Sequence, residues 1–145
     1  WSRWDKVFED SSPWYGKPIT AMALDVRRGM DRAAAAAGKG TNVSPVGEAF
    51  NCAIAAGLAD SRPFDGIGPG QVNLWGDDNH HASTHGYYLE ALTVFATVTG
   101  KDPRSLGPGE LAAADLGISP AHAVGLQKVA WASVNAQACN KALLQ

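Results

Sequence analysis

The sequence predicts an α/β fold in which helices predominate and one or two short strands contribute. Apolar residues recur at three- and four-residue steps in several segments, and glycines separate these segments. One short β-branched stretch lies between two of the helical patterns. Hydrophobic residues make up 46% of the 145 positions, which is enough for the core of a single domain or of part of a domain.

The first half of the chain is expected to form two helices around a strand. An irregular, aromatic-rich arm covers residues 1–16, and a helical period then runs from Ile19 to Ala37. Residues 41–46 are partly β-branched and bounded by glycines, which is typical of a short strand. A helix from Glu48 to about Ala59 should follow, and this order of elements favours the α/β class.

The second half begins with a glycine- and proline-rich loop at residues 60–76, a length that is usually functional or disordered. Ser83 can cap a broadly apolar helix that runs to about Thr99. A short helix is predicted from Pro108 to Leu116. The pair Ser119-Pro120 then marks the start of a last helix that should reach about Leu143.

Composition argues against nucleic-acid binding and against a transmembrane segment. The formal charge is −2 and no Lys/Arg run occurs, so nucleic-acid binding has little support. No apolar run approaches the roughly 20 residues that a transmembrane helix needs. Cys52 and Cys139 both lie in apolar, helix-like contexts and are interpreted as buried free thiols, with a disulfide left possible. Compartment and oligomeric state stay open.

The run from Asp77 to Tyr87 holds two carboxylates and three of the four histidines of the chain. Such groups are costly to bury without partners, and histidine titrates near neutrality, so the cluster indicates chemistry more than packing. It lies where the loop meets the helix that follows, a common place for a functional site.

Three interpretations of the cluster compete. An aspartate and a histidine three residues apart can form the orienting half of a nucleophilic triad. Metal binding would instead draw on Asp77, Asp78, His80, His81 and His85, although their spacing matches no strong motif. In the third interpretation the polar side chains only cap the helix and face solvent.

The longer string from Asp78 to Tyr87 resembles the last conserved block of the SGNH (GDSL-type) hydrolases, which reads Asp-x-x-His-Pro-Ser/Asn-x-x-Gly-Tyr. Its positions are taken here by Asp78, His81, Ser83, Gly86 and Tyr87, while Ala82 replaces the common proline. The segments 44–50 and 88–103 also look like one branch of this superfamily.

The resemblance implies a three-layer α/β/α fold, of which this chain would be the C-terminal portion, and an ester substrate with no cofactor or metal. His81 would act as general base and then general acid, and Asp78 would orient it. Asp77, His80, His85 and Trp75 would lie beside the site or along the substrate.

The nucleophile of such an enzyme is not evident in the sequence. Neither Gly-Asp-Ser-Leu nor Gly-x-Asn-Asp occurs, and Ser61 and Asn42 are only superficial matches. The serine and the oxyanion hole are therefore expected outside the chain, in an N-terminal part of the same hydrolase that precedes Trp1. A metal-dependent hydrolase and a non-enzymatic helical binding domain remain the alternatives.

Overall fold

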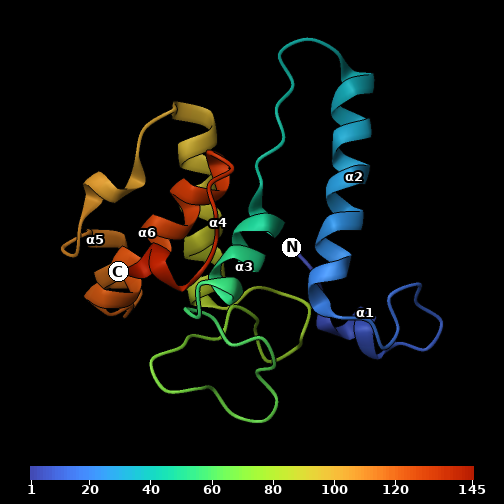
Figure 1. The fold of residues 1–145 in the computed structure, drawn as a ribbon, viewed down its shortest axis with the longest axis horizontal. Helices are drawn as coiled ribbons and strands as arrows, with labels where there is room; N and C mark the ends of the chain where they lie inside the picture. Colours follow the sequence, from blue (N-terminus) through green and yellow to red (C-terminus); the bar gives the residue numbers. More distant parts are fainter.

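The computed structural model describes residues 1–145, and its regular structure is helical (Figure 1). The α-helices are α1 (Trp4–Phe8), α2 (Ile19–Ala37), α3 (Val46–Ala55), α4 (Thr84–Thr99), α5 (Leu111–Asp115) and α6 (Pro120–Val134). Two short 3-10 helices are η1 (Pro103–Leu106) and η2 (Lys141–Leu144). None of the helices combines the length and the apolar character needed to span a bilayer.

The predicted α/β class is wrong for these residues, because no sheet forms. Strand-like pairing is limited to two isolated bridges, Ala59 with Val72 and Trp75 with Ala82. The expected strand at 41–46 is a connection without regular structure, and α3 begins at its last residue. A strand needs a neighbour for its backbone N–H and C=O groups, and no segment pairs with this one.

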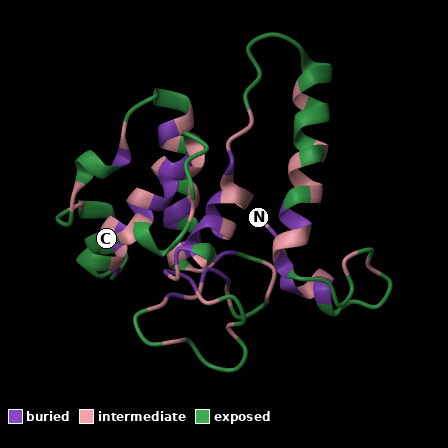
Figure 2. Cartoon of the chain, viewed as in Figure 1, coloured by how far each residue is buried: buried purple, intermediate pink, exposed green.

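The core lies where α3, α4 and α6 pack against one another. Figure 2 shows buried residues gathered on these helices, whereas the loops at the lower edge of the view are mostly exposed. Each large apolar side chain contributes about 1.5–3 kcal/mol by leaving water. The fully buried members include Phe50, Leu74, Trp75, Leu89, Leu126 and Val129.

Two helix predictions are confirmed at both ends. α2 covers Ile19–Ala37, and α4 begins after Ser83, whose hydroxyl accepts the Gly86 N–H at 3.2 Å. Gly100 ends α4 at φ 68°, a conformation that glycine adopts without a steric penalty. The helix expected from Glu48 to Ala59 instead begins at Val46 and ends at Ala55.

The last helix ends much earlier than predicted, and the two cysteines are bonded. α6 stops at Val134, and Ala136 adopts φ 50°, so the chain turns back before Cys139. Cys139 then forms a disulfide with Cys52 on α3, with 5.0 Å between the two Cα atoms. The interpretation as free thiols is therefore wrong, because the tail leaves the helix and reaches α3.

The aromatic arm is more ordered than predicted, since it contains α1. Trp4 and Val7 are buried, and the Trp75 indole donates a hydrogen bond to the Ser2 carbonyl at 2.8 Å. These contacts place residues 1–5 beside the turn that carries the acidic and histidine side chains.

Candidate functional site

The site is built on a tight turn between two buried residues, Trp75 and Ala82, which are bridged to each other. The Asn79 N–H donates to the Gly76 carbonyl at 3.0 Å, and the Gly76 N–H donates to the His81 carbonyl at 2.8 Å. Asn79 adopts φ 60°, a left-handed conformation that asparagine tolerates better than most residues. The turn thus projects its polar side chains from a fixed base.

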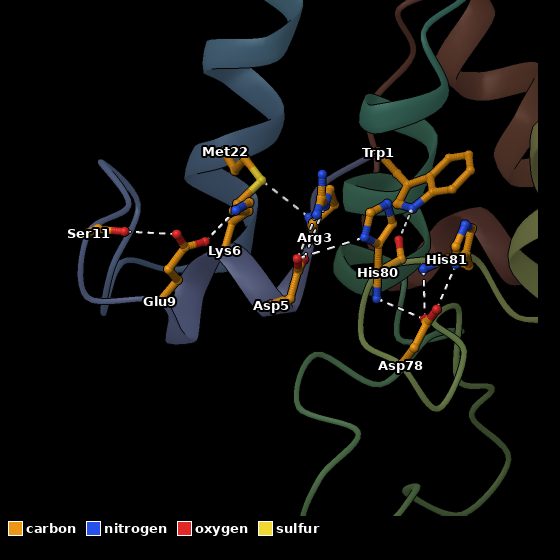
Figure 3. Close-up of polar contacts among 10 residues, drawn as sticks. All are labelled: Trp1, Arg3, Asp5, Lys6, Glu9, Ser11, Met22, Asp78, His80 and His81. Atoms are coloured by element: carbon orange, nitrogen blue, oxygen red, sulfur yellow. Dashed lines mark hydrogen bonds and ion pairs between the residues drawn. The ribbon is translucent and has the colours of Figure 1, made fainter.

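Asp78 accepts three hydrogen bonds within this turn (Figure 3). Its Oδ1 accepts the N–H groups of His80 and His81 at 3.0 and 2.9 Å, and its Oδ2 lies 2.6 Å from His81 Nδ1. The imidazole of His81 and these two backbone donors hold the pKa of the Asp78 carboxyl well below its ordinary value. The carboxylate is therefore ionised throughout the neutral range.

The contact with Asp78 assigns roles to the two nitrogens of His81. An ionised carboxylate accepts a proton donor, so Nδ1 carries the hydrogen and Nε2 is left as the basic nitrogen. The His81 side chain is 62% exposed, and no side-chain hydroxyl of the chain hydrogen bonds to it. Nε2 can therefore take a proton from a hydroxyl group that approaches from outside.

His80 lies against His81 and is contacted by the N-terminal arm. The two imidazole rings are stacked, with centroids 4.6 Å apart and planes 21° apart. His80 Nδ1 is 3.8 Å from Asp5 Oδ2, and the His80 carbonyl accepts the Trp1 indole N–H at 3.1 Å. Sequence reasoning did not find Asp5 or Trp1, because neither is near the cluster in the chain.

The remaining members of the predicted cluster lie apart. Asp77 is exposed and forms no ion pair or side-chain hydrogen bond. His85 is on the first turn of α4, where its ring meets that of His122 on α6 edge to face, 5.6 Å between centroids. Burial lowers the pKa of His85, and the nearby His122 lowers it further.

The structure does not bring together the side chains that a metal site would need. No three side chains among the histidines, cysteines, aspartates and glutamates of the chain converge in a geometry that could hold an ion. His80 and His81 stack face to face instead of directing their nitrogens to one point. A tetrahedral site needs at least three protein ligands, and this turn does not assemble them.

Trp75 and Gly86 pack beneath the turn and have structural roles. Trp75 is buried and packs against Phe50 and Trp4, so it lies in the core and not on an open pocket wall. A Cβ on Gly86 would lie 2.2 Å from the Leu74 carbonyl oxygen and 2.9 Å from the Ala82 Cβ. Gly86 is thus required by the close approach of α4 to this segment.

No candidate nucleophile joins His81 in this chain. Ser61 is exposed in the loop and has no hydrogen bond to His81, and Ser83 donates to the Asn73 carbonyl at 2.6 Å. Asn42 lines a groove of about 490 Å³ between α2 and the start of α3. That groove includes neither Asp78 nor His81.

Comparisons with known proteins return no relative. No protein family, no curated protein and no solved structure matches the chain. The resemblance to SGNH hydrolases therefore rests on sequence motifs alone, namely the block from Asp78 to Tyr87 and the segments 44–50 and 88–103, and the layered sheet it implies is absent from these residues.

Proposed function

We propose that Asp78 and His81 form the acid–base pair of a serine ester hydrolase whose nucleophilic serine lies outside these 145 residues. The observation that carries the proposal is the 2.6 Å contact between Asp78 Oδ2 and His81 Nδ1 on an exposed turn. Such a contact keeps the imidazole in the tautomer that a general base requires.

In the proposed reaction, His81 Nε2 accepts the proton of the serine hydroxyl as the serine oxygen attacks the ester carbonyl carbon. The imidazolium then gives this proton to the departing alcohol, which leaves an acyl-serine. Water repeats the sequence, so the acid is released and the serine regains its proton. Asp78 stays ionised and stabilises the imidazolium in both halves.

The contact between Asp78 and His81 Nδ1 supports this proposal, because it leaves the other ring nitrogen, Nε2, accessible to a hydroxyl group. The two backbone N–H bonds to Asp78 Oδ1 also fix the carboxylate before any substrate arrives.

The test is the turnover of p-nitrophenyl acetate by the native protein that carries this chain. His81→Ala should lower kcat by about 10³-fold or more, because the general base is lost. His122→Ala is the matched control and should leave kcat unchanged. A His81→Ala variant with wild-type turnover, or a wild type without turnover, would exclude the ester-hydrolase proposal.

The location of the nucleophile is tested with the 145-residue chain alone. Since no hydroxyl of this chain hydrogen bonds to His81, it should hydrolyse the ester no faster than an equal concentration of free imidazole. Turnover equal to that of the native protein would place the nucleophile within these residues.

A further inference from the structure

His80 makes a set of contacts that the proposed reaction does not use. Its ring stacks on His81, its Nδ1 lies 3.8 Å from Asp5, and its carbonyl oxygen accepts the Trp1 indole N–H (Figure 3). The backbone of α1 is joined to the same turn, because the Asp5 N–H donates to the Asn79 carbonyl at 3.2 Å. Residues 1–5 therefore hold the main chain of this turn by hydrogen bonds, and Asp5 lies within ion-pair distance of the His80 side chain.

Asp5 is itself fixed by a second side chain. The Arg3 guanidinium donates two hydrogen bonds to the Asp5 carboxylate, from Nε to Oδ1 at 3.1 Å and from Nη2 to Oδ2 at 2.6 Å. A planar, two-point contact of this kind restricts rotation of the carboxylate more than a single bond would. Asp5 Oδ2 thus faces His80 from a defined position.

His81 needs such support because its own contacts leave one motion free. The side chain is 62% exposed and has one hydrogen bond, at Nδ1, so the ring can swing about that contact. Proton transfer depends on the direction of Nε2, and a small misplacement of a reacting group lowers the rate. A flat neighbour against the ring face removes this freedom.

We propose that His80 is a positioning residue: its ring, which lies beside Asp5 and whose main-chain carbonyl is held by Trp1, fixes the plane of the His81 imidazole. The effect on turnover rests on the function proposed above. The effect on the His81–Asp78 hydrogen bond does not, and it can be measured without a substrate.

The experiment compares His80→Ala with His80→Phe by proton NMR. An imidazole N–H held against a carboxylate gives a sharp signal far downfield, and the signal broadens when the contact opens to water. His80→Ala should broaden or remove the His81 Nδ1 proton signal, whereas His80→Phe should keep it because phenylalanine retains a stacking face. His122→Ala, which removes the other ring–ring contact, is the control.

Turnover in the native protein gives the second measurement. His80→Ala should lower kcat about two- to tenfold, the range expected for one aromatic contact, with KM unchanged and with recovery in His80→Phe. The His80 side chain is 43% exposed, so the alanine variant removes no core residue, and its amide spectrum should match the wild type.

A wild type without a downfield His81 Nδ1 signal would overturn the positioning role, because a ring fixed against Asp78 keeps this proton from water. A His81 signal as sharp in His80→Ala as in the wild type would overturn the positioning role, and so would loss of the signal in both variants. If the signal behaves as expected while His81→Ala keeps full turnover, the proposed function fails and the positioning role of His80 stands.

Discussion

The chain contains two pairs of histidines in contact, and they are built in opposite ways. His80 and His81 stack on an exposed turn, and each has a carboxylate beside it. His85 and His122 meet edge to face on the first turns of α4 and α6, and neither forms an ion pair. The comparison shows that partners and solvent access, more than a count of histidines, separate a candidate acid–base pair from a packing pair.

The largest effect is expected from removing the carboxylate charge of Asp78, the partner of His81 in the exposed pair. In the native protein, Asp78→Asn should lower kcat on p-nitrophenyl acetate by about 10³–10⁴-fold, because an amide can favour the wrong tautomer and cannot stabilise the imidazolium. Asp77→Asn, which removes a neighbouring carboxylate without partners, should leave kcat within about twofold. Equal effects of the two variants would show that Asp78 does not orient His81.

The next effect concerns Gly86, which follows His85 on the first turn of α4. Gly86→Ala should destabilise the fold by about 1–3 kcal/mol or more, because its Cβ would collide with the Leu74 carbonyl oxygen. Gly29→Ala is the control, since its Cβ meets nothing within 4 Å, and it should stabilise α2 by up to about 1 kcal/mol. Urea unfolding curves measure both, and an unchanged midpoint in Gly86→Ala would contradict the close packing of α4.

The smallest effect is on the pH dependence of folding stability, which should differ between the two histidine pairs. The pKa of His85 is lowered in the folded state, so the unfolded chain binds more protons as the pH falls through 6.5, and stability should decrease there. His85→Gln should flatten this dependence in unfolding midpoints measured from pH 7.5 to 5.5. A wild type whose midpoint does not change over this range would show that His85 is not desolvated.

Asp78 also makes the folded protein less stable as the pH falls, but in a more acidic range than His85. Its carboxyl pKa is lowered in the folded state, so its contribution to stability is complete above the ordinary value of 3.8 and is lost as the pH falls below it. The two pairs should therefore respond in separate windows. Asp78→Asn should alter the acid limb only, while His85→Gln should alter the limb near neutrality.

The helices with strong end signals were predictable from the sequence. α2 and α4 follow an apolar period that ends at glycine, and Ser83 supplies a cap. The false strand at 41–46 arose because β-branched residues favour a strand only where a partner exists, and a local pattern does not show partners. The end of α6 was missed because Ala136, a good helix former, adopts φ 50° where the tail turns back.

The sequence predicted only those contacts of the site that join residues close together in the chain. The contact of Asp78 with His81 follows from a three-residue spacing on a turn. The assignment of His85 to a different pair depends on α4 starting at Thr84 and packing on α6. The approach of Asp5 and Trp1 to His80 joins residues more than 70 positions apart, and no short motif encodes such a contact.

The disulfide has a consequence for how the chain behaves once it is cut. The bond between Cys52 and Cys139 closes a ring of chain that contains the exposed loop at 61–70, the turn with Asp78 and His81, and helices α4 and α6. Exposed loop tips are preferred sites of proteolytic nicking. A single cut in that loop would leave both pieces covalently joined, so the nicked protein should keep its full mass until it is reduced.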